Sequence, residues 1–227
     1  MQQDLALQPY LQPSDTIDSD HATIRQFAAQ TTEDADGPEG KAVRLYYAVR
    51  DGIRYDPYGI DMSVHGLRAS GTLEKRRGWC VSKAVLLAPA CRAAGIPARL
   101  GFADVRNHLS TERMRAQMQT DVFYWHGYTS IYLSGNWVKA TPAFNIELCQ
   151  RCGLKPLSFD GRGDAIYHSF DLQGNRHMEY LGDRGQYQDV PIERIRETFL
   201  QEYALTKPGT DLNFERDVDR ETAPRGN

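Results

Sequence analysis

The chain has 227 residues, of which 41% are hydrophobic and 25% charged, and its net charge at neutral pH is −3. The composition is that of a globular protein, and the small negative charge excludes the basic surface that nucleic acid or an anionic membrane would require. No apolar run reaches the roughly 18 residues that cross a bilayer. Residues 1–15 contain neither the basic nor the apolar region of a signal peptide. Four cysteines do not make a disulfide framework in a chain of this length, so we expect a cytoplasmic protein with reduced thiols.

The N-terminal part of the sequence predicts a short edge strand followed by two helices. The strand covers residues 5–11 and is ended by prolines. Polar residues at 18–20 are suitable N-caps for the first helix, and Pro38 suits the first turn of the second. The apolar faces of these helices are formed by Ile24, Phe27 and Ala28 in the first, and by Ala42, Leu45, Tyr46 and Val49 in the second.

A third helix is expected to begin at Cys80. Its apolar stripe consists of Val81, Ala84, Val85, Ala88 and Cys91. Gly95 fits the position just after the helix, and Pro97 prevents its continuation. Pro89 lies inside the run and removes one backbone hydrogen bond, which predicts a kink or a shorter helix.

Antiparallel strands are predicted to follow. Residues 98–105, 121–133 and 137–141 read as strands, and Ser134-Gly135-Asn136 supplies a hairpin turn between the last two. A further helix is expected over residues 191–203. The fold class is therefore α+β, with helices first and an antiparallel sheet after them.

Cys80 has two possible roles. At a helix N-terminus, free N–H groups and the helix dipole stabilise a thiolate and lower the pKa of the thiol. Arg76 and Arg77 add positive potential, and His126 in the predicted strand could accept the thiol proton. The alternative is a small buried hydrophobic residue, because free cysteine is among the residue types most often buried.

The predicted hairpin suggests a third member for a Cys–His pair. A two-residue turn at Gly135-Asn136 would place Thr141 opposite Ser130. It would likewise place Asn145 opposite His126. Both side chains would then share the face of the histidine, where a group that accepts a hydrogen bond from the imidazole would fix its orientation.

Four motifs resemble the transglutaminase-like superfamily. They are Gly78-Trp79-Cys80, Gly95-Ile96-Pro97-Ala98-Arg99, Trp125-His126-Gly127-Tyr128 and Trp137-Val138-Lys139-Ala140-Thr141-Pro142. Their order and spacing match the family over roughly residues 40–145. The resemblance implies a papain-like α+β core, with N-terminal helices packed on an antiparallel sheet. It also implies that Cys80 is the nucleophile and His126 the general base.

The sequence departs from the family at one position. The family usually has an aspartate four residues after the tryptophan of the returning strand, where this chain has Thr141. A threonine hydroxyl can accept a hydrogen bond from imidazole, but it has no charge to stabilise the imidazolium. Asn145 could orient His126 as an amide does in papain-like proteases. Position favours Thr141 and chemistry favours Asn145, and the departure also leaves open a weak or inactive enzyme.

The resemblance implies one transglutaminase-like domain over residues 1–205, with a core of about 40–145 and an extension over 146–205. Residues 206–227 are predicted to be a loose polar tail. The implied function is acyl transfer through a Cys80 thioester on amide bonds of a peptide or protein, most simply as a cysteine peptidase or amidase. The alternative is a binding module on the same core with an unreactive Cys80.

No cofactor or metal is expected. Cys149 and Cys152 form a single CxxC motif. A structural zinc site needs a second pair of ligands, and none follows at the spacing of a standard zinc finger. We therefore interpret them as two structural thiols. The sequence predicts no oligomeric state.

Overall fold

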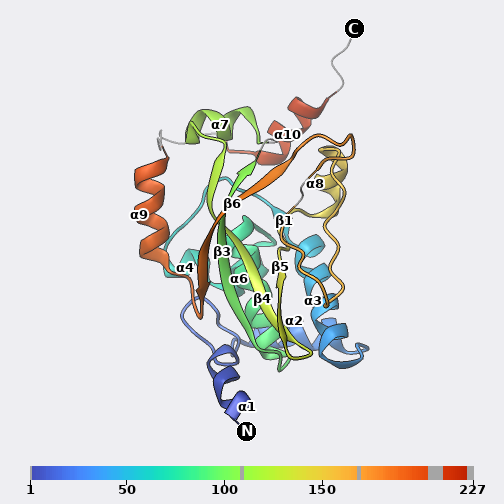
Figure 1. Ribbon diagram of the computed structural model, residues 1–227. Coiled ribbons are helices and arrows are strands. Elements are labelled where there is room, and N and C mark those ends of the chain that lie inside the picture. Colours follow the sequence, from blue (N-terminus) through green and yellow to red (C-terminus); the bar gives the residue numbers. More distant parts are fainter. Residues whose placement is uncertain (1, 108–109, 168–169, 204–211, 224–227) are drawn as a thin grey trace.

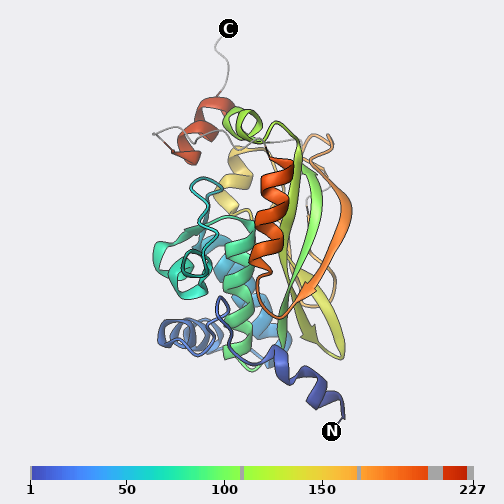
Figure 2. The ribbon, with the colours of Figure 1, turned by 90° about the vertical axis from the view of Figure 1, so that its left-hand side faces the viewer.

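The protein consists of one antiparallel sheet with helices packed against it (Figure 1). The computed structural model describes residues 2–107, 110–167, 170–203 and 212–223. Figure 2 shows the sheet along one side of the molecule and the larger helices on the other. The predicted α+β class, with helices packed on an antiparallel sheet, is therefore confirmed.

Helices occur along the whole described chain, whereas the long strands come after residue 97. The helices are α1 (Gln2–Leu7), η1 (Gln8–Tyr10, a 3-10 helix), α2 (Ala22–Thr32), α3 (Gly37–Gly52), α4 (Val64–Leu67), α5 (Ala69–Lys75), α6 (Cys80–Ala93), α7 (Glu112–Met118), α8 (Ile146–Arg151), α9 (Ile192–Glu202) and α10 (Phe214–Thr222). The strands are β1 (Arg54–Tyr55), β2 (Arg77–Gly78), β3 (Ala98–Asn107), β4 (Val122–Leu133), β5 (Asn136–Ala140) and β6 (Met178–Tyr187). In this described part of the chain, none of the helices has the length and apolar character needed to cross a bilayer.

The main sheet has the strand order β5-β4-β3-β6, and all its neighbours are antiparallel. The turn between β4 and β5 is Ser134-Gly135 rather than the predicted Gly135-Asn136. Both turn residues have positive φ, 46° and 86°, as a type I′ turn requires. Ser130 therefore lies opposite Lys139 instead of Thr141, so the predicted register is wrong by two residues. A shift of two keeps every side chain on its predicted face.

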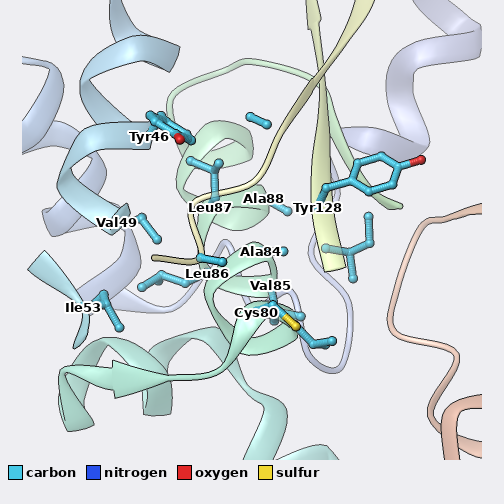
Figure 3. Close-up of a cluster of buried hydrophobic side chains, with 14 of the residues drawn as sticks. Tyr46, Val49, Ile53, Cys80, Ala84, Val85, Leu86, Leu87, Ala88 and Tyr128 are labelled. Atoms are coloured by element: carbon cyan, nitrogen blue, oxygen red, sulfur yellow. The ribbon is translucent and has the colours of Figure 1, made fainter. Parts of the chain in front are cut away.

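Helix α6 lies at the centre of the core. Every residue from 80 to 92 is buried, because α2, α3 and α5 pack on one side of the helix and β3 and β4 on the other. The hydroxyl of Thr129 on β4 donates to the carbonyl of Ala84 at 2.9 Å. Figure 3 shows part of this cluster, with Cys80 on the same helix as the buried leucines. Contacts on all sides stabilise the helix, which continues through Pro89 to residue 93, so the predicted shortening does not occur.

Lys83 is a charged residue buried completely within this core, one turn after Cys80. Its Nζ donates hydrogen bonds to the carbonyl oxygens of Arg50 at 2.9 Å and Ile53 at 2.5 Å. These carbonyls lie at the C-terminal end of α3, where a cationic group is favourable. Burial lowers the pKa of Lys83 to about 7. Lys83 thus fastens α6 to the segment that leads from α3 into β1.

Two terminal segments differ from the sequence predictions. Residues 5–11, predicted as an edge strand, belong to α1, η1 and the residue that follows. Within the predicted polar tail, residues 214–222 form α10, while 206–211 and 224–227 lie outside the described residues. Phe214 and Val218, four residues apart, are the buried apolar contacts of α10. A single apolar pair in a charged segment is too weak a pattern to predict a helix.

A buried carboxylate attaches α10 to the rest of the molecule. Asp217 is 1% exposed, and its Oδ2 accepts hydrogen bonds from the Tyr58 hydroxyl at 2.9 Å and from Nε of Arg113 at 2.7 Å. The Tyr58 hydroxyl also lies 2.8 Å from the hydroxyl of Thr111. These bonds connect α10 to α7 and to the loop between β1 and α4.

Candidate active site

Cys80 is the first residue of α6, as the sequence predicts. It follows β2, which pairs in parallel with β1, so the chain enters the helix from a fixed direction. Trp79 precedes it in an extended conformation, with φ −85° and ψ 179°. The backbone N–H groups of Cys80, Val81 and Gly127 interact with the sulfur. The thiol therefore lies among the backbone donors that were expected to stabilise a thiolate.

Burial of the thiol outweighs these donors. Cys80 is 5% exposed, and desolvation raises the pKa of its thiol to about 11, against the downward pull of the three N–H groups. The prediction that the helix N-terminus lowers this pKa below its ordinary value is therefore wrong. The sequence places Cys80 at the helix start but cannot predict how completely aromatic neighbours remove water from the thiol.

Strand β4 approaches the first turn of α6 very closely at Gly127. A Cβ atom at this position would lie 2.9 Å from Cα of Val81 and 3.4 Å from the carbonyl oxygen of Cys80. Only a residue without a side chain allows this contact between backbones. The glycine that follows His126 therefore brings the histidine strand against the start of the cysteine helix.

His126 lies next to an irregularity in the sheet. It pairs with Ala103, and the register between β3 and β4 shifts between this pair and the pair of Val105 with Phe123, so that β4 contains a bulge just before His126. Trp125 has φ 60°, which is rare for a bulky residue, and its N–H donates to the carboxylate of Asp104 at 3.1 Å. Its indole N–H donates to the Thr198 hydroxyl at 2.9 Å. These bonds hold the backbone immediately before His126 in an uncommon conformation.

Cys80 and His126 line the same cavity, which has a volume of about 420 Å³. His126 is 3% exposed, so both proposed catalytic residues lie at a buried part of the wall. Most of the remaining wall comes from α7, from α9 and from the loop between β1 and α4, and β1, Trp79, β4 and residues 203 and 212 complete it. Two residues that are distant in sequence and chemically complementary are thus brought to one site.

Thr141 immediately follows β5, on the strand next to that of His126. The last registered pair of the hairpin is Thr129 with Ala140, so Thr141 continues alongside the segment that contains the histidine. Thr141 is buried, and its Oγ1 has no hydrogen-bond partner among the described residues. Its carbonyl oxygen accepts from the Tyr46 hydroxyl at 3.2 Å. The position that holds aspartate in the family thus carries a buried hydroxyl in this chain.

Asn145 is also buried, but its amide is engaged elsewhere. Its Oδ1 accepts from the N–H of Tyr55 at 3.0 Å, and its Nδ2 donates to the carboxylate of Glu147 at 2.6 Å. Because Tyr55 lies on β1, these bonds connect the chain after the hairpin to the strand pair that leads into Cys80. The structure therefore gives Asn145 a clear role in holding the site together.

Several aromatic residues of the cavity wall were not predicted from the sequence to belong to the site. The Tyr203 hydroxyl accepts a hydrogen bond from the N–H of Tyr124 at 2.9 Å, and the ring centroids of Trp79 and Phe199 are 6.0 Å apart. The apolar face of the helix over residues 191–203 was the available signal. That signal predicts burial, but it does not say which surface the helix covers.

The CxxC cysteines lie at the end of α8. Cys149 and Cys152 are free thiols, and burial raises the pKa of both, that of Cys149 to about 12. No group of three or more His, Cys, Asp or Glu residues in the described ranges is arranged to hold a metal ion. Both cysteines contribute to the packing of α8 against the core.

Two solved structures are similar to this chain. A candidate cysteine protease from Cytophaga hutchinsonii aligns with 18% identity and a TM-score of 0.48, covering 80% of this chain and 54% of that protein. A candidate protease from Parabacteroides distasonis aligns with 17% identity and a TM-score of 0.38, covering 52% of this chain and 22% of that protein. This chain therefore spans about half of the first protein and less than a quarter of the second. No curated protein matches the chain.

A family model identifies the core. The model of the transglutaminase-like superfamily matches residues 25–142, which is more than half of the 227 residues. The matched region begins in α2 and contains Cys80, His126 and Thr141. The chain belongs to the transglutaminase-like superfamily.

Proposed function

We propose that the protein is a thiol acyl-transfer enzyme that hydrolyses amide bonds, as a cysteine peptidase or amidase. The observation that carries this proposal is the shared cavity of Cys80 and His126, with Cys80 at the N-terminus of α6. A nucleophile, a base and backbone N–H donors at one wall are the groups that acyl transfer needs.

The first half of the reaction forms a thioester. His126 takes the proton from the Cys80 thiol as the sulfur attacks the amide carbonyl. Because burial raises the pKa of the thiol to about 11, this proton leaves during the attack rather than before substrate binds. N–H groups at the start of α6 stabilise the oxyanion. The imidazolium of His126 then gives its proton to the departing amine as the C–N bond breaks.

The second half releases the acyl group. A water molecule attacks the thioester carbonyl and gives a proton to His126. The C–S bond breaks, the sulfur takes back a proton, and a carboxylic acid leaves. Hydrolysis is the preferred outcome by likeness to the family's peptidases and amidases, whereas attack by a second amine in place of water would give transamidation.

The scheme also needs a hydrogen-bond acceptor for the imidazole, and the described structure contains no hydrogen bond between Thr141 Oγ1 and His126. Thr141 occupies the family's aspartate position, and its buried Oγ1 has no partner among the described residues. A hydroxyl there can fix the orientation of the ring without stabilising its charge. Asn145 is the weaker candidate, because both ends of its amide already have partners.

A binding module with an unreactive cysteine is the second candidate function. It is favoured by the high pKa of the Cys80 thiol and by the lack of a carboxylate at position 141. Such a protein would use the same cavity to hold an amide-containing ligand without breaking it.

Acylation of Cys80 tests the proposal directly. The protein would be incubated with a set of peptide amides and activated peptide esters. The reaction would be quenched in acid, and the mass of the intact protein would be measured by mass spectrometry. We expect an added acyl group on Cys80 and release of the amine or alcohol. Cys80→Ala should remove both, whereas Cys152→Ala, a matched cysteine outside the cavity, should not. Turnover that persists in Cys80→Ala would exclude a thiol mechanism. Ligand binding without acylation of the native protein would favour the binding module.

A further inference from the structure

The wall of the Cys80 cavity is mainly apolar and aromatic. The described residues that provide its apolar and aromatic surface are Tyr55, Pro57, Tyr58, Ile60, Met62, Trp79, Met114, Met118, Phe123, Tyr124, Phe199, Leu200, Tyr203 and Leu212. They come from six separate segments of the chain, so the surface results from the tertiary fold and not from one amphipathic helix. Apolar surface arranged around a reactive group favours a ligand that brings apolar surface of its own.

Methionine is concentrated in this wall. The chain has five methionines, and three of them, Met62, Met114 and Met118, line the cavity. An unbranched thioether side chain adapts to ligands of different shape better than a branched or aromatic one. The wall is therefore suited to a class of large apolar groups rather than to one rigid shape.

Charged groups are scarce in the same wall. Among the described residues that line the cavity there is no aspartate or glutamate, and the cation is Arg196. The Arg196 side chain is 55% exposed and forms an ion pair with Glu193 at 3.5 Å, so its charge is already partnered and in contact with water. A charged side chain entering the cavity would lose hydration and find no opposite charge inside, which is unfavourable.

We infer that this cavity is the specificity subsite of the enzyme, and that it accepts a large aromatic or aliphatic side chain on the acyl side of the amide bond that Cys80 attacks. The inference rests on the proposed function and names its substrate class. A dry cavity of about 150 Å³ binds one benzene. A volume of about 420 Å³ is thus enough for a phenylalanine-sized group together with part of the peptide that carries it.

Affinity labels separate this inference from the proposed function. N-acetyl amino acid chloromethyl ketones alkylate a cysteine by displacement of chloride, and their side chain occupies the acyl-side subsite. We would measure the second-order rate constant at Cys80 for phenylalanine, leucine, lysine and aspartate labels, each relative to iodoacetamide. The expected result is at least about tenfold faster labelling by the phenylalanine and leucine compounds.

A pair of variants on α7 provides the matched control. Met118→Glu places a carboxylate in the cavity wall, whereas Ala116→Glu places the same charge on an exposed position of the same helix outside the wall. We expect Met118→Glu to lose the preference for apolar labels and to react faster than the native protein with the lysine label. Ala116→Glu should keep the native order. Circular dichroism and thermal unfolding would confirm that both variants are folded.

The possible outcomes distinguish the two ideas. Equal rates for all labels, or faster reaction with charged ones, would overturn the subsite while leaving Cys80 as nucleophile. If no label reacts at Cys80, the proposed function fails, and equilibrium binding of N-acetyl-phenylalaninamide and N-acetyl-lysinamide then decides the subsite. Preferential binding of the phenylalanine amide would support the apolar subsite, and equal or weaker binding would overturn it.

Discussion

The region matched by the family model and the region after it contribute different things to one cavity. Residues 25–142 provide Cys80, His126 and the backbone donors around the thiol. The later residues provide Phe199 and Leu200 on α9 and Leu212 just before α10, all of them apolar parts of the wall. The proposed chemistry is thus located in the family core, and the apolar surface that would choose a substrate is shared between this core and the C-terminal segment.

This difference has a physical basis. Acyl transfer requires a few groups within hydrogen-bond reach of one carbonyl, so the elements that hold them have little freedom. An apolar wall needs only the right volume and little charge, and many packings of helices satisfy that. Changes at Cys80 and His126 should therefore affect the rate of the reaction, whereas changes in the apolar wall, in the core or in the C-terminal segment, should affect which substrate binds.

The largest effect is expected from His126→Ala. Loss of the proposed general base should lower kcat/KM for an amide substrate by about 10²–10⁴-fold. Asp219→Asn, an exposed change on α10, serves as the matched control and should have little effect. Steady-state kinetics on both variants would check this. A fall of less than about threefold in His126→Ala would remove the histidine from the mechanism and weaken the distinction between the two regions.

The pH dependence of Cys80 alkylation should be almost as large. Because burial raises the pKa of the thiol to about 11, little thiolate is present at neutral pH. The rate with iodoacetamide, without substrate, should therefore rise by about tenfold per pH unit through pH 8 and 9, because only the thiolate reacts. Site-resolved mass spectrometry over a pH series would measure it. A plateau near pH 7 would show instead that a preformed thiolate exists.

A smaller effect should separate the two candidates for the third member. If Thr141 orients the imidazole, Thr141→Ala should lower kcat by about tenfold, roughly the 1.4 kcal/mol of one hydrogen bond. Thr141→Asp should keep or increase activity, because a carboxylate stabilises the imidazolium. Asn145→Ala should mainly lower the free energy of unfolding, since the N–H of Tyr55 loses its acceptor. A large loss of kcat in Asn145→Ala with unchanged stability would reverse this assignment.

The smallest effect on activity is expected from Asp217→Asn, which tests the C-terminal segment. The hydrogen bond from Arg113 lowers the pKa of the Asp217 carboxyl. The folded state therefore favours the carboxylate, and this stabilisation is present above the unfolded pKa near 3.9 and is lost as pH falls below it. The variant should lose about 1–3 kcal/mol of stability at pH 7.

The same variant should raise KM for apolar substrates by a few fold while kcat changes little, because Asp217 also holds Tyr58 in the cavity wall. Denaturation at pH 7 and at about pH 3, together with kinetics, would check both parts. Asp219→Asn again provides the control. An unchanged KM with the expected loss of stability would mean that α10 supports the fold without shaping the subsite.

The sequence predicted the core elements because their signals are local. Helix α3 has a regular apolar face and Pro38 in its first turn. Gly95 follows the end of α6. Cys80, His126 and Thr141 could be proposed as site residues because their motifs keep the spacing of the family. The hairpin register was wrong because Ser134 adopts positive φ, a conformation that glycine and asparagine reach more readily than serine.

Tertiary contacts explain what the sequence could not predict. The high pKa of Cys80 depends on how closely α9 and the loop after β1 cover the thiol, and neither contact leaves a pattern in the sequence. The bulge at Trp125 likewise depends on Asp104, which lies on another strand. Helix α10 forms because Asp217 finds partners that are distant in the chain.

Because the amine of Lys83 is buried, unfolding should take up protons between about pH 7 and the pH of maximum stability. Burial lowers its pKa to about 7, whereas the unfolded chain holds this proton until about pH 10.4, so stability should rise with pH above 7. The buried thiols lower the free energy of unfolding as pH rises above about 8.5, because the folded state keeps protons that the unfolded chain releases. These are Cys80, Cys91, Cys149 and Cys152. From these groups, the free energy of unfolding should pass through a maximum near about pH 8. On the acid side of this maximum, at about pH 7, the enthalpy of unfolding should change with the ionisation enthalpy of the buffer, and at the maximum itself this dependence should vanish.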